Sequence, residues 1–345
     1  MMMNNKTYLT PGQRSWLRFK SNRRGYISLW LFGILFSLSL VSEILFNDKP
    51  LLVNYQGEYY FPFVVSYPET TFGGDFETET DYVDEYVREQ ITSGSNWVID
   101  PPVRFSYNTI NLLSDAANPA APSSDNLLGT DDRGRDVLAR LVYGFRLSVL
   151  FAFVLTVLGV AIGIVMGAIQ GYFSGKIDLF MQRIIEVWSS MPELYLLIIF
   201  ASIFQPSVWL LIVLLSLFGW MGLSDYVRAE FLRGRNMDYV RAAKAMGLSD
   251  FSIMRNHLLP NSLTPVITFL PFRISGSILA LTSLDFLGLG VPPTTPSLGE
   301  LLSQGKENIE AWWLSLGAFV VLVGTLMLLI FIGEALREAM DTRKN

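Results

Sequence analysis

The sequence predicts an all-α polytopic membrane protein with six transmembrane helices and a small mixed α/β insert. Its 345 residues are 51% hydrophobic and 17% charged, whereas soluble domains carry roughly 25% charged residues. Six apolar stretches approach the length of about 20 residues that a helix needs to cross a bilayer. Basic and acidic residues also alternate between the connections of these stretches, as in a chain threaded through a membrane.

Four of the predicted spans are unbroken apolar runs with at most one charged residue each: 26–46, 147–173, 263–284 and 312–332. The other two come from residues 194–223, an uncharged run of 30 residues that is too long for one span. A Gln-Pro-Ser sequence at 205–207 interrupts this run. We therefore expect a tight helical hairpin whose first arm starts near Val187 and leaves Glu193 close to one membrane face.

The charges of the connections orient the spans. Residues 1–25 hold six Lys or Arg and no acid, whereas residues 47–124 hold twelve acids and three bases. The connection 224–262 has six bases against four acids, and the tail after residue 334 is basic. Because loops rich in Lys and Arg stay in the cytoplasm, we expect both termini and the 224–262 connection inside and the 47–124 insert outside.

The chain is expected to have six parts. They are a cytoplasmic segment 1–25, a first transmembrane helix 26–46, an outer insert 47–124, an interfacial elbow 125–146, a five-helix core 147–334 with the cytoplasmic connection 224–262, and a cytoplasmic tail 335–345. We expect the first helix to remain uncleaved, because residues 46–48 offer no small-residue cleavage site of a signal peptide.

The outer insert is too long for a simple loop and is expected to be partly folded. Residues 51–61 favour a β-hairpin, residues 81–91 have helical spacing, and residues 118–124 are typical of a linker. Thirteen aromatic residues lie between Tyr55 and Tyr107, enough for a small core. The insert is either a cap on its own membrane domain or a docking surface for a soluble external partner.

The elbow precedes the second span. Thr130 or Asp131 can cap a short helix there, and Asp136 and Arg140 stand four residues apart, as an ion pair on a helix requires. The candidate elbow residues are Gly129, Thr130, Asp131, Gly134, Arg135 and Asp136.

Four glycines recur every fourth residue along the second span: Gly159, Gly163, Gly167 and Gly171. They predict a helix face that another helix can approach closely. Plain packing is the favoured interpretation, and a sliding contact in a gate is the alternative.

Arg273 lies near the middle of the fifth span, two residues after Pro271. A charge inside a membrane segment is a functional-site hypothesis, because it must face water or a partner. A structural pair with an acid on another span or subunit is an equal alternative.

The inner connection holds an Ala-rich helical segment that ends at Gly247, then a second segment expected to end before Pro260. A short helix parallel to the membrane would fit a groove of another protein. A solvated amphipathic loop explains the same pattern, and both interpretations remain open from the residues alone.

Several function classes are excluded or disfavoured. The chain has no Cys and a single His, His257, so thiolate and multi-histidine metal sites are excluded. Gly175-Lys176 and Gly305-Lys306 lack the rest of a phosphate-binding loop, so nucleotide chemistry belongs to another chain. A net charge of −5 disfavours nucleic-acid binding.

Two other classes of function are weaker alternatives. A membrane-embedded enzyme needs a cluster of reactive groups, and the charged residues of the spans are few: Glu43, Glu193, Arg273 and Asp285. A membrane scaffold or sensor would explain the outer insert but not the inner Ala-Ala-Gly loop.

These motifs resemble those of the integral-membrane permeases of ATP-binding-cassette importers, in the oligopeptide/dipeptide/nickel group. The inner loop of that family reads Glu-Ala-Ala-x3-Gly-x9-Ile-x-Leu-Pro, and the matching positions here are Arg241, Ala242, Ala243, Gly247, His257, Leu259 and Pro260. Arg241 replaces the Glu and His257 replaces the Ile. Further similarity to this group lies in residues 128–136, 144–148, 284–290 and 297–300. The front end, residues 23–26 and 47–53, resembles the branch of Yej-type transporters for peptides and microcin C.

The resemblance implies a type I importer permease fold that forms half of a channel in the bacterial inner membrane. Its substrates would be oligopeptides, with microcin C-like peptides among the candidates, and the chain itself would have no catalytic residue, cofactor or metal. The implied partners are a homologous second permease, cytoplasmic ATPase subunits that bind ATP and Mg, a periplasmic peptide-binding protein and membrane lipid, with no nucleic acid. The loop 237–260 would couple the helices to the ATPase.

Overall fold

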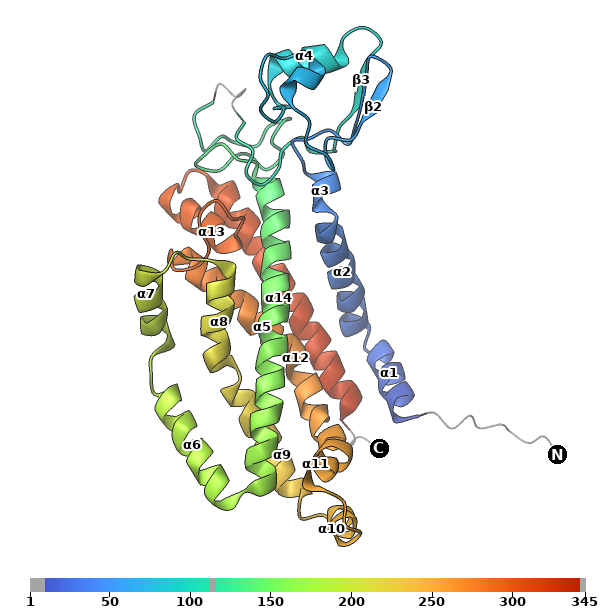
Figure 1. The fold of residues 1–345 in the computed structure, drawn as a ribbon, viewed down its shortest axis with the longest axis vertical. Coiled ribbons are helices and arrows are strands. Elements are labelled where there is room, and N and C mark those ends of the chain that lie inside the picture. The colour runs from blue at the N-terminus through green and yellow to red at the C-terminus, as the bar shows by residue number, and fades with distance from the viewer. Residues whose placement is uncertain (1–9, 112–115, 342–345) are drawn as a thin grey trace, which may run out of the picture. The chain divides into compact units, whose positions relative to one another are not determined.

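A computed structural model describes residues 10–111 and 116–341 (Figure 1). Four residues of the predicted charge pattern lie outside these ranges: Lys6, Asp115, Arg343 and Lys344. The chain divides into two compact units, which are treated separately below. The first unit comprises Met1–Gly33, Val149–Leu281 and Gly324–Asn345, and the second comprises Ile34–Ser148 and Thr282–Val323.

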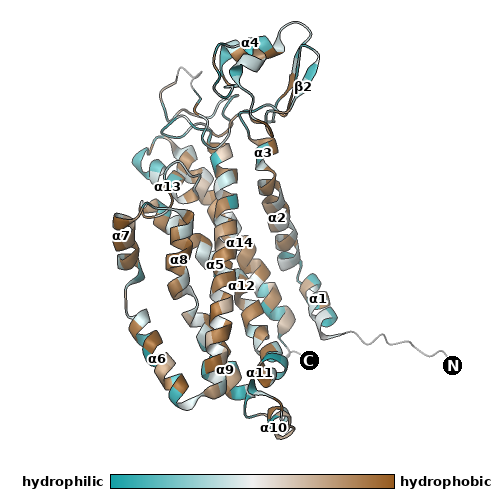
Figure 2. Ribbon diagram, viewed as in Figure 1, coloured by the Kyte–Doolittle hydropathy of each residue, from teal (hydrophilic) through white to brown (hydrophobic). Residues whose placement is uncertain are grey.

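Four helical stretches within the described residues are long and apolar enough to cross a membrane (Figure 2). They are α5 (Val137–Phe173), α8 with α9 (Val208–Gly219 and Met221–Gly234), α11 with α12 (Asp250–Ile253 and Leu259–Phe286, joined by a π-helical turn at Met254–Leu258), and α14 (Trp312–Met340). A bent helix pair brings the total to five at most. The predicted first span becomes α2 (Arg23–Leu40) and α3 (Ser42–Leu45). Because two arginines occupy the first turn of the 18-residue α2, it is not among the candidate spans, and the count of six is not confirmed.

The expected first arm of the hairpin is shorter than predicted. Helix α6 (Gly175–Ser189) ends before Pro192, and α7 (Glu193–Ile203) starts after it at an angle of 65°. A proline removes one helical hydrogen bond and clashes with the preceding turn, and at Pro192 the helix breaks instead of running on from Val187. The predicted turn at 205–207 is confirmed, because the Ser207 hydroxyl accepts a hydrogen bond from the Leu210 amide at 3.2 Å and caps α8.

The insert of the second unit contains a three-stranded antiparallel sheet in the order β2-β1-β3. The predicted hairpin is confirmed as β1 (Leu52–Tyr55) and β2 (Glu58–Tyr60), with Gln56 and Gly57 at φ of +53° and +87° between them. Two positive φ angles fit the tight turns of hairpins. Strand β3 (Trp97–Ile99) pairs with the other side of β1 and was not predicted, because its three residues are too few to show an alternating pattern.

The predicted aromatic core of the insert is confirmed. Phe72 lies at its centre, on the short 3-10 helix Glu69–Phe72, and its ring makes edge contacts with Tyr55, Tyr60, Tyr67 and Tyr82 at 5.3 to 6.1 Å. Helix α4 (Glu85–Thr92) begins later than the predicted residue 81, because the Asp84 carboxylate caps it. Tyr82, which precedes the helix, is buried, whereas Tyr86 within it is exposed.

The remaining helices complete each unit. In the first unit, α1 (Pro11–Ser21) contributes Phe19 to a small core with Ala335 and Ala339 of α14, and α10 (Asp238–Ala245) joins a larger core with α5 and α9. In the second unit, α13 (Leu298–Glu307) follows a loop whose Ser297 hydroxyl caps it.

Candidate functional site

The inner connection is anchored to the first unit by one face of α10. Val240 and Ala243 are 3% and 1% exposed, and they pack in one core with Phe231 of α9 and with Ile253 and Leu258 of the following turn. These contacts hold α10 firmly, although it has only eight residues. Short isolated helices are unstable in water, so this packing is what orders the segment.

Gly247 ends α10 as predicted. Its φ of +80° is left-handed, its amide donates to the Lys244 carbonyl at 3.0 Å, and the Leu248 amide donates to the Ala243 carbonyl at 3.2 Å. This pair of bonds is the Schellman ending of a helix, which favours glycine. A Cβ atom at Gly247 would meet nothing within 4 Å. The requirement for glycine therefore comes from the backbone and not from packing.

The second segment does not end before Pro260, which corrects the prediction. Ser249 caps α11, the chain then makes the π-helical turn, and α12 runs on through Pro260. The Leu259 amide donates to the Met254 carbonyl five residues earlier. In this wider turn the hydrogen bonds span five residues instead of four, directly before Pro260. Because Pro260 has no N–H to donate, the turn allows the helix to accommodate it.

The connection is also tied to the end of α5. The Tyr172 hydroxyl donates to Asp250 Oδ1 at 2.5 Å, and Arg235 Nη1 donates to the Tyr172 carbonyl at 2.8 Å. Tyr172 therefore contacts the connection on both sides of α10, at the residue that follows α9 and at the first residue of α11. Sequence reasoning missed this tyrosine, because its partner lies 78 residues away.

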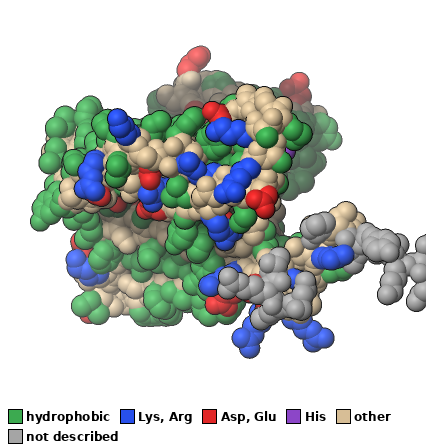
Figure 3. Space-filling model, turned by 90° about the horizontal axis from the view of Figure 1, so that it is seen from below, with side chains coloured by type: hydrophobic (Ala, Val, Ile, Leu, Met, Phe, Trp, Pro, Cys, Tyr) green, Lys and Arg blue, Asp and Glu red, His purple; other side chains and the backbone are tan. Residues whose placement is uncertain are grey.

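The connection also carries large apolar side chains that are uncovered. Tyr239, Met246 and Phe251 are 44%, 73% and 70% exposed, and we call them the exposed loop face. Lys and Arg gather among hydrophobic side chains on the face of the molecule seen in Figure 3. Arg241 and Lys244 of α10 are exposed, and Arg241 Nη1 lies 3.9 Å from Asp238 Oδ1. Of the other predicted loop residues, Ala242 and Pro260 are exposed, whereas His257 and Leu259 are half-buried.

The glycine stripe of α5 packs against the chain around α9, which supports the packing interpretation. A Cβ atom at Gly167 would lie 2.5 Å from the Ser224 carbonyl oxygen, and one at Gly171 would lie 2.6 Å from that of Arg228. Gly163 faces Leu223 and the Trp220 carbonyl in the same way. The two backbones approach so closely that any larger residue would force them apart.

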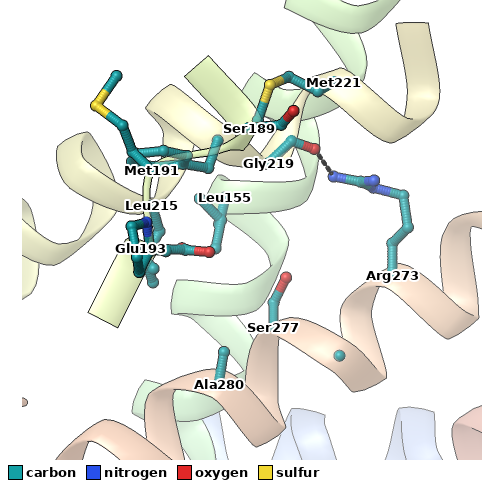
Figure 4. A pocket seen from close by; sticks show the side chains of 13 residues that line it. Leu155, Ser189, Met191, Glu193, Leu215, Gly219, Met221, Arg273, Ser277 and Ala280 are labelled. Carbon is teal, nitrogen blue, oxygen red and sulfur yellow. Dashed lines mark hydrogen bonds between the residues drawn. The ribbon is translucent and has the colours of Figure 1, made fainter. Parts of the chain in front are cut away.

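Arg273 borders a cavity in the first unit. Its Nη2 donates to the carbonyl of Gly219 at the end of α8 (Figure 4). A Cβ atom at Gly159 would lie 2.9 Å from the same nitrogen, so the first glycine of the stripe leaves room for the guanidinium.

The predicted elbow residues form a buried ionic cluster in the second unit. Arg135 Nε donates to Asp131 Oδ2 at 2.7 Å, and the Asp131 side chain is fully buried. The predicted pair between Asp136 and Arg140 does not form. Asp136 accepts from the Ala139 amide at 2.7 Å and so caps α5, while Arg140 contacts Asp131 and Glu300.

Glu300 completes this cluster and was missed as an ionic partner, because it follows Asp131 by more than 160 residues. Burial raises the pKa of its carboxyl, and the adjacent guanidiniums of Arg140 and Arg135 act in the opposite direction. The supposed linker 118–124 is also part of the elbow. The Ala120 amide donates to the Thr130 hydroxyl oxygen at 2.8 Å, and the Thr130 amide donates to the Ala120 carbonyl at 2.9 Å.

Comparison with known proteins gives a consistent set of relatives. The family model described as binding-protein-dependent transport system inner membrane component matches residues 143–345. The model described as N-terminal TM domain of oligopeptide transport permease C matches residues 10–67. A solved structure titled as an inward-facing MetNI methionine ABC transporter has a TM-score of 0.49 at 20% identity, covering 59% of this chain and 97% of that one.

Three curated relatives are similar over most of their length. The inner membrane ABC transporter permease protein YejE of Escherichia coli is 52% identical, over 97% of this chain and 98% of that protein. The peptidoglycan transport system permease protein YejE of Agrobacterium fabrum is 50% identical, over 96% and 93%. The oligopeptide transport system permease protein OppC of Lactococcus lactis is 35% identical, over 69% and 82%.

Proposed function

This chain belongs to the family of binding-protein-dependent transport system inner membrane components, and on that premise we propose that its α10–α11 connection couples the membrane helices to an ATPase subunit. The chain is a permease subunit of an ATP-binding-cassette peptide importer of the inner membrane, and ATP is hydrolysed by a separate subunit.

The observation that carries the coupling proposal is that the connection is fixed in place and yet carries uncovered apolar side chains. Val240 and Ala243 lie in the core, whereas Tyr239, Met246 and Phe251 are exposed. A solvated loop does not need large apolar side chains on its outer face, whereas a helix that lies in the groove of a partner does. The proposed coupling residues are those that match the family motif: Arg241, Ala242, Ala243, Gly247, His257, Leu259 and Pro260.

A movement of the docked connection would reach the helices by two routes. The Tyr172 to Asp250 hydrogen bond leads to α5, and the continuous run from α11 through α12 leads to Arg273. The close packing of the α5 glycines on α9 would make these helices move as one body. The partner ATPase binds ATP and Mg in this scheme and supplies the driving force, and no residue of this chain takes part in that chemistry.

The orientation of the chain is part of the proposal. We place segment 1–25, connection 224–262 and tail 335–345 in the cytoplasm, the insert 47–124 in the periplasm and the elbow 125–146 at the outer surface, with α2 as the sixth span. Charge supports this arrangement, because α1 carries Arg14, Arg18 and Lys20 on a helix without an acid, whereas the insert is strongly acidic.

The proposed partners follow from the family. They are a homologous second permease that completes the channel, one or more ATPase subunits, a periplasmic peptide-binding protein and membrane lipid. The proposed substrates are oligopeptides, since one relative bears the name of an oligopeptide permease. We add microcin C-like peptides to them because the front end of the chain resembles the Yej-type branch.

Peptide uptake and subunit composition test the proposed function together. A strain that lacks this gene should lose uptake of a panel of radiolabelled di- to hexapeptides and regain it with the plasmid-borne chain. Affinity-tagged chain should co-purify with an ATPase and a second permease, and should hydrolyse no ATP when isolated alone. Unchanged uptake of the whole panel in the deletion strain would contradict the assignment.

A further inference from the structure

A cavity of about 630 Å³ lies in the first unit, where α5, α12, the end of α8 and the break between α6 and α7 meet (Figure 4). Its volume falls within the range of roughly 300–1,000 Å³ that is usual for small-molecule sites. Leu155, Leu215 and Phe218 line part of it, so the wall is largely apolar. Two charged side chains border this apolar space, Arg273 from α12 and Glu193 from the first residue of α7.

The guanidinium of Arg273 is incompletely satisfied. A guanidinium has five N–H donors. Among residues 10–111 and 116–341, the carbonyl of Gly219 is the one acceptor with which the Arg273 guanidinium forms a hydrogen bond. Its Nε is buried without any acceptor. The described part of the chain also gives Arg273 no carboxylate within 4.0 Å. A cation held in an apolar region without a counter-ion is costly unless something else neutralises it.

Glu193 is exposed, so its carboxylate is open to an incoming ligand. It borders the same cavity, and within the described ranges its side chain takes part in no hydrogen bond or ion pair, Arg273 included. The sharp bend at Pro192 sets its position, since α7 begins there at 65° to α6. The cavity therefore carries one unpaired positive group and one unpaired negative group on different helices.

Neutral hydrogen-bonding groups complete the lining. Ser277 stands one helical turn after Arg273 on α12, and Ser189 ends α6. Gly276, the residue before Ser277, also lines the cavity. An added Cβ atom there would meet nothing within 4 Å, so the backbone of α12 is open at this point. A ligand with a carboxylate, an ammonium group and a polar backbone would satisfy all of these groups at once.

We propose that this cavity binds a short peptide by its two charged ends, with Arg273 receiving the carboxylate and Glu193 the ammonium group. The inference rests on the proposed function, because it takes peptides to be what passes through the chain. It adds the two residues that recognise them and the chemical feature recognised, which is independent of side-chain sequence. Recognition of the two ends suits a transporter that accepts peptides of many sequences.

The test is uptake of one radiolabelled tripeptide in three forms: with both ends free, as its C-terminal amide and as its N-acetyl derivative. The cells carry this chain as their single copy of the subunit. Wild-type cells should prefer the free peptide to each blocked form by about tenfold or more, since a hydrogen bond to a charged group contributes about 1.5–3 kcal/mol. Other subunits impose their own preferences equally on every strain, so the readout is the change in these ratios between strains.

Arg273→Gln should abolish the preference for a free carboxylate and keep the preference for a free amine, and Glu193→Gln should do the reverse. The matched control is Arg146→Gln, which removes a cation that pairs with Glu43 at 2.7 Å in the second unit. That control should keep both preferences.

Three results would overturn the proposal. The first is an absence of either preference in wild-type cells that do take up the free peptide, which leaves the proposed function intact. The second is an unchanged carboxylate preference in Arg273→Gln, which would show that the guanidinium does not receive the carboxylate. If Arg273→Gln is missing from the membrane, Glu193→Gln decides alone, and the third contrary result is its retention of the amine preference. A failure of wild-type cells to take up any form would instead contradict the proposed function itself.

Discussion

The hydroxyl of Tyr172 on the last turn of α5 donates a 2.5 Å hydrogen bond to the carboxylate of Asp250, the first residue of α11. This contact joins a candidate transmembrane helix to the connection that carries the exposed loop face. It gives the connection a fixed attachment to the helix that it is proposed to move.

Replacing Tyr172 with Phe should loosen this attachment without unfolding the chain. The lost hydrogen bond contributes about 1 kcal/mol or somewhat more, because its acceptor is charged but partly exposed. Amide hydrogen exchange across 238–258 should become faster, and peptide uptake should fall at normal membrane levels. Tyr195→Phe is the control, since Tyr195 is 65% exposed on α7. Unaltered exchange in Tyr172→Phe would show that the hydrogen bond does not hold the connection.

Gly247→Val should separate coupling from folding. A β-branched residue at a φ of +80° costs roughly 1–2 kcal/mol, and it would tilt α10 on its core contacts. We expect normal membrane levels, loss of uptake and uncoupled ATP hydrolysis in the assembled transporter. Gly57→Val is matched to it, because Gly57 also has a positive φ, of +87°, and also has nothing within 4 Å of an added Cβ. If both variants transport at the wild-type rate, the connection is only a solvated loop.

The elbow cluster should behave as a stabilising element. Asp131→Asn leaves Arg135 and Arg140 without a fully buried partner, and breaking a buried pair in this way costs about 3–5 kcal/mol. Thermal unfolding of the purified chain in detergent should therefore shift to a clearly lower midpoint. Arg133→Gln, at a half-exposed side chain 4.0 Å from Asp132, should leave the midpoint unchanged. Equal midpoints for the two variants would mean that the cluster does not stabilise the fold.

Single cysteines should report the proposed orientation, because the chain has no cysteine of its own. Ser95 is exposed on the insert and Gly12 is exposed on α1, and each is replaced singly, as Ser95→Cys and Gly12→Cys. An impermeant maleimide should label the first and not the second in intact spheroplasts. Labelling of Gly12→Cys but not of Ser95→Cys would show that the proposed orientation is inverted.

The sequence predicted those parts of the fold that depend on local signals. The β1–β2 turn, the interruption at 205–207 and the helix end at Gly247 each follow from a few adjacent residues, and each is confirmed. The close approach at the α5 glycines was also predictable, because a spacing of four residues defines one face of a helix.

The sequence did not predict contacts between distant residues. Glu300 and Tyr172 find their partners far along the chain, and neither has a nearby residue that signals this. Asp136 was assigned to Arg140 from their spacing, but its carboxylate serves as a helix cap, which satisfies otherwise unpaired backbone amides. Pro260 was expected to end a helix, and the π-helical turn that admits it leaves no local signature in the sequence.

The proposed function depends on contact between the exposed loop face and an ATPase subunit. Photocrosslinking in intact cells tests this contact directly. The crosslinker p-benzoylphenylalanine replaces Phe251, which is 70% exposed on the connection, and Phe76, 64% exposed on the insert, is the control position. Position 251 should form an adduct with a protein that mass spectrometry identifies by its phosphate-binding loop, and position 76 should not. An adduct with lipid alone at position 251, or the same ATPase adduct from both positions, would contradict it.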